Sequence, residues 1–183
     1  PAQLAVMFPL VSTVTELDAL LDEVSAIAAD LDDAGVDYAV PELGAMVETP
    51  ASVFLAREFA DRLDFLSIGT NDLTQYVMAA ARDDDRVASL HDPLHPPVLR
   101  AIARTVEAAH EGDAWVGMCG EMAGDPDLTE LLVGLGLDEL SMSAVTIPDV
   151  KAGVRDVDDE SAAALSEAAL SVETREDARA LID

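Results

Sequence analysis

The sequence predicts an α/β protein, specifically the C-terminal part of a (β/α)8 barrel with about five of its strands. Short and almost wholly apolar segments alternate with amphipathic helical segments, which is typical of a parallel sheet covered by helices. No G-x-G-x-x-G follows any of the apolar segments, which argues against an open dinucleotide-binding sheet. Polar side chains stand at the ends of several strands, and in a barrel those ends open onto one face.

The first β/α unit is expected to have its strand at residues 4–11. Thr13 and Glu16 form the T-x-x-E pattern of a capping box, so a helix begins there. The periodicity of this helix places five apolar residues on one face, namely Leu17, Leu20, Val24, Ile27 and Leu31.

The second and third strands are expected at residues 43–48 and 64–70. A helix follows the second strand at once, because Thr49 is a good N-cap and Pro50 suits the first helical position. The third strand ends in Gly-Thr-Asn, and a helical segment begins at Asp72. Each of these strands is therefore followed directly by polar residues.

The remaining units follow the same pattern. A Pro-rich loop at residues 92–97 precedes a helix over residues 98–112, which ends at a glycine. The fourth strand is expected at residues 114–121, a helix begins at the Asp-Pro pair 125–126, and the fifth strand covers residues 139–145.

The chain is predicted to form one domain over residues 1–183 that is incomplete at its N-terminus. Residues 1–148 would hold the strands and helices of the barrel, and residues 149–183 two or three short helices used for packing or an oligomer contact. Five strands do not close an eight-stranded barrel, and the first strand begins only three residues into the chain. We therefore expect an exposed parallel edge that makes the isolated chain unstable or prone to aggregate.

The charge balance is strongly acidic, with 37 acidic against 10 basic residues and a net charge of -27. Such a field repels nucleic acid and anionic membranes, so neither is an expected partner. Lys151 is the only lysine, and this scarcity favours a halophile's protein that folds in molar salt over an ordinary acidic mesophilic one. Cys119 is the only cysteine, which excludes an internal disulfide, and no membrane span or signal peptide is recognised. These features indicate a cytoplasmic protein.

Glu48 and Asp72 stand at the ends of consecutive strands and are candidate metal ligands. A pair of carboxylates is a sparse oxygen site of the kind that Mg²⁺ prefers, since this ion keeps waters and takes further ligands from its substrate. The alternative is that each acid caps the helix behind it. For either acid alone that alternative is the better one, but two in succession favour the metal site.

Two further residues are candidates for chemistry. Arg82 is a possible anion clamp, because its guanidinium matches phosphate or carboxylate, but a surface ion pair with Asp83, Asp84 or Asp85 is as good an interpretation. Cys119 at a strand end is a possible proton donor, although a buried inert cysteine is the more frequent case. The three histidines, His91, His95 and His110, show no metal-ligand spacing and are interpreted as structural.

Six stretches together resemble the phosphoenolpyruvate-binding barrel of the PEP-utilising enzymes: "MFPLVSTVTEL", "AMVETP", "FLSIGTNDLTQY", "AARDDD", "WVGMCGEMAGD" and "LGLDELSMSA". They are most similar to the Enzyme I family of the sugar phosphotransferase system. Pyruvate phosphate dikinase and phosphoenolpyruvate synthase share the fold and related signatures, and they stand as alternatives.

The resemblance implies a role for each candidate residue. Glu48 and Asp72 match magnesium ligands, and Asn71 and Asp72 match substrate-binding positions. Arg82 matches an arginine that binds the substrate phosphate, and Cys119 matches the acid that protonates the enolate carbon. The implied activity is Mg²⁺-dependent phosphoryl transfer from phosphoenolpyruvate to an enzyme histidine and on to the histidine-containing phosphocarrier protein, which leaves pyruvate. A homodimer is implied for the full-length protein.

The chain also departs from the family pattern. The phosphohistidine segment and the earlier barrel strands do not occur in it, so the isolated chain is expected to be inactive. Ala81 and the Asp83-Asp84 pair replace the residues that usually flank the arginine. A non-catalytic product of a split gene is therefore a second hypothesis from a different class.

Overall fold

The computed structural model describes residues 4–182, and its five strands form one parallel sheet in the order β1-β2-β3-β4-β5. The strands are β1 (Ala5–Phe8), β2 (Glu42–Val47), β3 (Phe65–Gly69), β4 (Trp115–Cys119) and β5 (Glu139–Ser141). Each strand pairs in parallel with the next one along the chain. A doubly wound sheet would reverse its order at a switch point, whereas a barrel keeps the order of the sequence. The predicted α/β class and partial barrel are confirmed.

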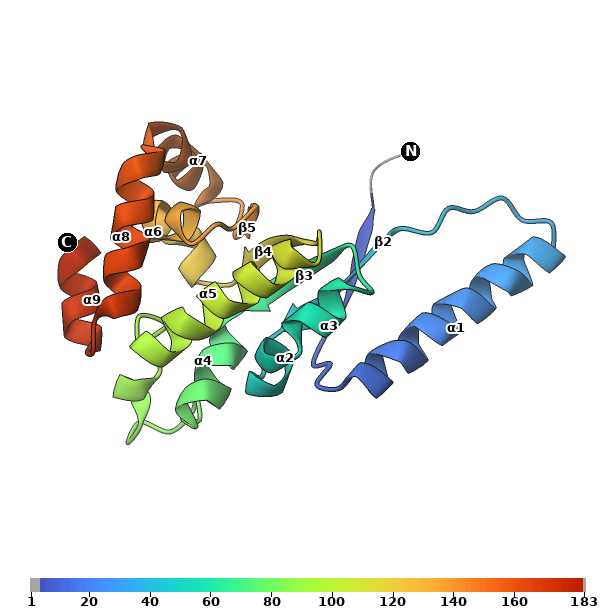
Figure 1. Ribbon diagram of the computed structural model, residues 1–183, viewed down its shortest axis with the longest axis horizontal. Coiled ribbons are helices and arrows are strands. Elements are labelled where there is room, and N and C mark those ends of the chain that lie inside the picture. Colours follow the sequence, from blue (N-terminus) through green and yellow to red (C-terminus); the bar gives the residue numbers. More distant parts are fainter. Residues whose placement is uncertain (1–3, 183) are drawn as a thin grey trace.

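The helices lie between the strands and after the last one, as the alternating pattern predicts (Figure 1). They are α1 (Val14–Asp33), α2 (Pro50–Phe54), α3 (Ala56–Ala60), α4 (Thr70–Met78), α5 (Pro96–Glu111), α6 (Thr129–Gly134), α7 (Ile147–Asp156), α8 (Asp159–Ser171) and α9 (Arg175–Ile182). Short 3-10 turns occur at η1 (Ala88–Leu90), η2 (Met122–Gly124) and η3 (Pro126–Leu128).

The helix starts agree with the local signals. The Thr13 hydroxyl accepts a hydrogen bond from the Glu16 backbone N–H at 3.2 Å, and the Glu16 carboxylate accepts one from the Thr13 N–H at 2.9 Å. Thr49 caps α2 and Pro50 is its first residue. Four predictions differ in extent. The helix after Thr49 breaks at Leu55 into α2 and α3, and the first strand stops before Leu10, whose φ of 54° turns the chain. The fifth strand, expected at residues 139–145, ends at Ser141, and the helix expected from residues 125–126 begins as a 3-10 turn and becomes α-helical only at Thr129.

The core lies between one face of the sheet and the helices. The buried side chains of the three central strands on this face are Ala45, Val47, Leu66, Ile68, Val116 and Met118, each with no exposed surface. The other face carries the alternate residues, among them Phe65 and Trp115, whose rings stack in parallel with centroids 4.4 Å apart. The Phe65 ring occupies the space above Gly44, where any side chain would collide with it. This second face corresponds to the inside of a barrel.

Helix α1 extends away from the rest of the molecule (Figure 1). Of its five predicted core residues only Leu17 is buried, and Ile27 is 51% exposed. Leu20, Val24 and Leu31 are partly buried. Within residues 4–182, the expected apolar face of α1 is therefore only partly covered.

The C-terminal helices pack against the barrel helices, one of the two uses predicted for them. Helix α8 lies against α6 and α5. At the closest point, Gly134 of α6 meets the backbone of Ala162 in α8. The glycine permits this approach because it has no Cβ.

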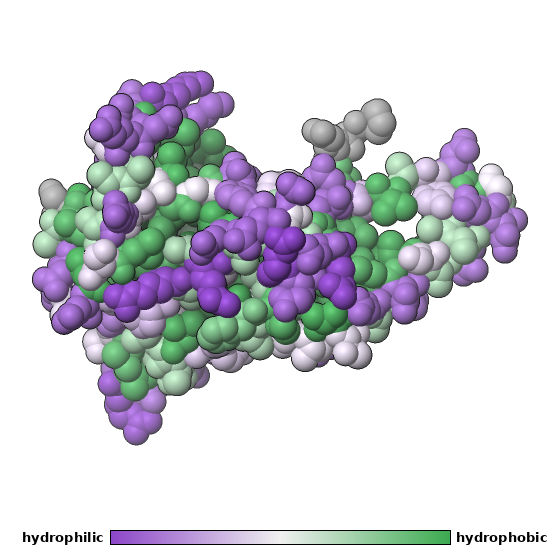
Figure 2. Space-filling model, in the orientation of Figure 1, coloured by the Kyte–Doolittle hydropathy of each residue, from purple (hydrophilic) through white to green (hydrophobic). Residues whose placement is uncertain are grey.

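Hydrophilic residues cover much of the face shown in Figure 2, as the acidic composition requires. Within residues 4–182, the structure contains no helix that is both long and apolar enough to span a membrane.

Gly134→Ala should lower the free energy of unfolding by about 1–3 kcal/mol, because the added methyl group overlaps the Ala162 carbonyl and must push α8 away from α6. Gly153→Ala is the control, since its added methyl group would meet only side-chain atoms of Thr129 at 3.2 Å or more. Chemical denaturation of both variants measures the difference. Equal stabilities would show that α6 and α8 do not pack as closely as described.

Candidate functional site

The predicted site residues lie at one edge of the sheet. Glu48 follows the last residue of β2, Asn71 and Asp72 are in the first turn of α4 directly after β3, and Cys119 is the last residue of β4. Because these three strands are neighbours and parallel, their carboxyl ends meet at the same edge. The arrangement of backbone elements is the one that the sequence predicts.

Glu48 is a nearly buried carboxylate, only 4% exposed. Its Oε1 accepts a hydrogen bond from the Leu10 N–H at 2.8 Å, and no basic side chain among residues 4–182 pairs with it. Burial raises the pKa of Glu48, the Leu10 hydrogen bond lowers it, and the negative charge of Asp72 raises it further. Glu48 does not cap the helix behind it, because Thr49 does so.

Asp72 and Arg82 lie next to each other on the exposed side of the site. The Arg82 Nη1 is 3.7 Å from the Asp72 Oδ1, and both side chains are about half exposed. The alternative ion pair with the following acids is not the one observed, because Asp84 pairs with Arg86 at 2.7 Å instead. Arg82 therefore points back towards the first turn of α4, where Asp72 stands.

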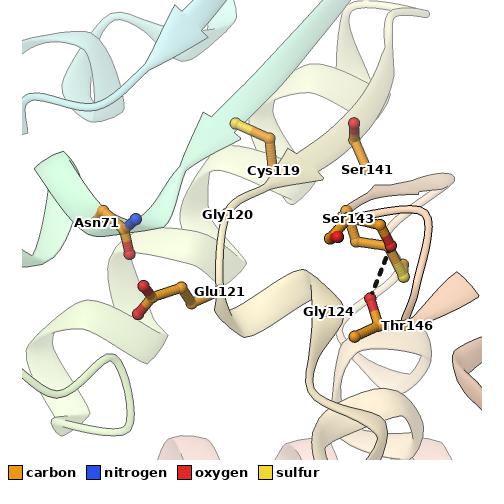
Figure 3. A pocket seen from close by; sticks show the side chains of 9 residues that line it. Asn71, Cys119, Gly120, Glu121, Gly124, Ser141, Ser143 and Thr146 are labelled. Atoms are coloured by element: carbon orange, nitrogen blue, oxygen red, sulfur yellow. Dashed lines mark hydrogen bonds between the residues drawn. The ribbon is translucent and has the colours of Figure 1, made fainter.

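Asn71 and Cys119 line a cavity of about 510 Å³ at the ends of β3, β4 and β5. Glu121, Ser141, Ser143 and Thr146 also line it (Figure 3). Glu48, Asp72 and Arg82 are not among its lining residues. The structure thus forms two neighbouring groups, a charged one at Glu48, Asp72 and Arg82, and a polar cavity that holds Asn71 and the thiol.

The Cys119 thiol is held in its neutral form. Its Sγ donates to the Ile68 carbonyl at 3.7 Å. Burial raises the pKa of Cys119, and the charges of Glu48 and Glu139 raise it further, while contact with Ser67 acts in the opposite direction. A raised pKa leaves the thiol protonated at neutral pH, which is the state a proton donor requires.

Thr70, Gly120 and Thr146 also shape the cavity, and they are not among the predicted site residues. The Thr70 hydroxyl donates to the Cys119 carbonyl at 3.3 Å and ties α4 to the end of β4. Gly120 takes a φ of 111°, which favours glycine, and a Cβ added there would lie only 3.0 Å from the Thr70 hydroxyl oxygen. In the sequence, the glycine directly after Cys119 is the feature that could have indicated this close approach. Thr146 closes the far side by donating to the Ser143 carbonyl at 3.0 Å (Figure 3).

Metal ligands are sparse in the described part of the chain. Residues 4–182 contain no group of three or more His, Cys, Asp or Glu side chains arranged to hold a metal ion. His110 pairs with Asp138 at 2.8 Å, and the His95 ring lies 3.3 Å from the Ser89 carbonyl. Both contacts agree with the structural interpretation of these histidines.

Comparison with known proteins shows the family to which the chain belongs. Residues 1–159 match the family model described as PEP-utilising enzyme, PEP-binding domain. The chain belongs to the PEP-utilising enzymes. The resemblance found in the sequence motifs is thereby confirmed for most of its length.

Similar PEP-utilising proteins carry the name phosphoenolpyruvate-protein phosphotransferase. One from Haloferax volcanii is 62% identical over 174 residues, which is 95% of this chain and 31% of that protein. One from Listeria monocytogenes is 44% identical over 185 residues, which is 98% of this chain and 32% of that protein. The chain thus spans about a third of the length of these curated relatives.

The fold also has a relative among solved structures. A citrate lyase from Burkholderia xenovorans superimposes with a TM-score of 0.61 at 19% identity, covering 97% of this chain and 60% of that one. At this identity the likeness concerns the fold. It agrees with the assignment of this PEP-utilising chain to a partial barrel.

The pH profile of Cys119 alkylation by iodoacetamide should have its midpoint above the value for the denatured chain, which is expected near the ordinary thiol pKa of about 8.5. A raised pKa means less thiolate at pH 8, so the folded chain should react several-fold more slowly there. Because Cys119 is the only cysteine, the reaction reports on it alone. The midpoint does not depend on accessibility, so a midpoint at or below the denatured value would contradict the assigned environment.

Proposed function

We propose that this chain is the phosphoenolpyruvate-binding part of a phosphoenolpyruvate-protein phosphotransferase, or Enzyme I. The observation that carries the proposal is the nearly buried Glu48 carboxylate, which has no basic partner among residues 4–182 and lies at a strand end near the negative charge of Asp72. The Arg82 Nη1 lies 3.7 Å from the Asp72 Oδ1, so a guanidinium stands beside this pair of carboxylates. The names of the similar proteins support the same activity.

The residues fit a magnesium ion. Burying a charged carboxylate is unfavourable unless a cation or hydrogen bonds compensate it, and Glu48 accepts one hydrogen bond, on Oε1. The neighbouring charge of Asp72 adds to the cost. A cation held by Glu48 and Asp72 would relieve both effects, and two protein carboxylates are a usual number for Mg²⁺. When bound, the ion would supply positive charge opposite the phosphate and carboxylate of the substrate.

The other residues then have distinct tasks in the proposed reaction. Arg82 neutralises phosphoryl oxygens while the phosphoryl group passes from the substrate oxygen to a histidine outside this chain. Asn71 binds the substrate from the first turn of α4, at the wall of the cavity. The bond that breaks leaves an enolate, and the neutral Cys119 thiol donates a proton to its carbon to give pyruvate. The raised pKa of Cys119 keeps this proton available at neutral pH.

We further propose the setting in which this reaction takes place. The acceptor beyond the histidine is the histidine-containing phosphocarrier protein of a sugar phosphotransferase system, in the cytosol of a halophile. The full-length enzyme is proposed to be a homodimer. The scarcity of lysine and the net charge of -27 support the halophilic setting.

Calorimetric titration of phosphoenolpyruvate and Mg²⁺ into the chain in about 2 M KCl, where screening extends only a few Å, tests the site. Asp72→Asn and Glu48→Gln should each weaken Mg²⁺-dependent binding about tenfold or more, because each removes a charged ligand. Asp37→Asn, which removes one exposed acid from the loop before β2, should bind as the unmodified chain does.

The same variants separate a lost ligand from a misfolded chain. The raised pKa of Glu48 means that the folded state holds its proton more tightly, so the stability contributed by Glu48 falls as the pH rises through that pKa. At neutral pH and without Mg²⁺, Glu48→Gln should therefore raise Tm, by about 2–4 °C for each kcal/mol. Folded variants that bind as well as the unmodified chain would refute the metal site.

Affinity for phosphoenolpyruvate should pass through a maximum as KCl is raised. Salt first screens the repulsion between an anionic substrate and a chain of net charge -27, and only then weakens the local attraction of Mg²⁺ and Arg82. Titrations from about 0.1 M to about 3 M KCl measure this, over which the Debye length falls from about 10 Å to below 3 Å. A steady fall in affinity from low salt upward would contradict the halophilic setting.

A further inference from the structure

The loop between α4 and α5, residues 79–95, carries Arg82 at its start. Arg82 is 3.7 Å from Asp72, and both side chains are about half exposed, so this contact is a weak anchor. At its far end the loop is fixed by Leu94, which is fully buried. In between, the His91 Nε2 is buried and has no hydrogen-bond partner among residues 4–182. An unpaired buried polar atom costs free energy, so the loop itself is not strongly held and gains from contacts with the rest of the molecule.

The C-terminal helix α9 supplies such contacts. The Arg175 Nη1 donates to the Ser89 carbonyl at 3.2 Å and lies 3.8 Å from the Asp92 Oδ2. The Arg179 Nη2 is 4.0 Å from the same oxygen. The other carboxylate oxygen of Asp92 accepts a hydrogen bond from the Leu94 N–H at 3.0 Å, which joins these contacts to the buried end of the loop. Two arginines of α9 therefore meet one half-buried carboxylate of the loop.

The segment that presents Arg175 is itself held in place. Arg100 of α5 donates through Nε to the Leu170 carbonyl at 3.1 Å and through Nη2 to the Val172 carbonyl at 2.9 Å. These carbonyls lie at the end of α8, directly before α9. The second guanidinium nitrogen of Arg175 lies 2.7 Å from the Glu176 carboxylate, which fixes its direction. Both C-terminal helices lie at the end of the molecule where α5 begins (Figure 1).

The use of arginine at this junction is notable in so acidic a chain. Of ten basic residues, Arg100, Arg175 and Arg179 are placed here, although acids are abundant over the whole surface. Arg100 and Arg175 bind backbone carbonyls, whose position depends on the fold, in addition to or instead of carboxylates. We infer that the α8–α9 segment is a clamp for the 79–95 loop, and that Arg175 acts as a positioning residue that holds Arg82 towards the substrate. The second part of this inference rests on the proposed function of Arg82.

Limited trypsin digestion tests the clamp directly, because trypsin cleaves after Arg82 and Arg86 within the loop. Arg175→Ala should raise cleavage at these two sites about fivefold or more, since cleavage follows the population of the locally opened loop. Cleavage after Arg57 in α3 reports on global unfolding and should stay unchanged. Arg155→Ala is the matched control, since it removes the same charge from α7, and Arg155 forms no ion pair or side-chain hydrogen bond within residues 4–182.

Titration with phosphoenolpyruvate and Mg²⁺ tests the second part. Arg175→Ala should weaken binding several-fold, less than Arg82→Ala does, and the double variant should bind no worse than Arg82→Ala alone, because both changes act through one guanidinium. The clamp would be overturned if Arg175→Ala did not raise cleavage after Arg82 and Arg86. It would also be overturned if that cleavage rose only as much as cleavage after Arg57.

The remaining outcomes separate the inference from the proposed function. A loosened loop with binding that is sensitive to Arg82→Ala but not to Arg175→Ala would overturn the positioning role. A loosened loop with binding that is insensitive to both changes would overturn the function proposed for Arg82 and support the clamp itself.

Discussion

Parallel pairing of β2 with β3 and of β3 with β4 fixes the position of every candidate site residue, because the chain leaves each of these strands at the same edge of the sheet. The pairing in turn depends on the face opposite the helices, where Gly44 leaves room for the Phe65 ring and this ring stacks on Trp115. Without that close packing, the relative positions of Glu48, Asp72 and Cys119 would not be fixed. The positions of the candidate site residues therefore depend on packing within the sheet.

Charge is the second organising constraint. In a chain with a net charge of -27, every cation is scarce, and the position of each arginine is informative. Arg82 lies against Asp72, and Arg175 and Arg179 meet Asp92, so the ion pairs with the 79–95 loop connect both of its ends to structured elements. Many acids form no ion pair within residues 4–182, but Glu48 differs from the others among them because it is nearly buried. A metal ion is the simplest compensation for it.

The division of the site into two groups has a physical consequence. The charged group is suited to binding an anion through a cation and an arginine, whereas the cavity holds a neutral thiol whose pKa is raised by burial. Phosphoryl transfer and protonation of carbon make opposite demands on their surroundings, one for concentrated charge and one for a retained proton. In the proposed reaction, the two groups on neighbouring strands serve these two steps separately. The chain spans about a third of the length of its similar proteins.

The sequence by itself determined the strands, the helix starts and the identity of the strand-end residues. These follow from local rules, such as the Thr13–Glu16 capping box and the apolar runs, which act over a few residues and need no knowledge of the fold. Tertiary structure alone decided that the apolar face of α1 is only partly covered within residues 4–182, that Arg82 pairs with Asp72 and not with its neighbours in the chain, and that Arg175 reaches Ser89. Such contacts join residues far apart in the chain and depend on side-chain geometry, which no local pattern encodes.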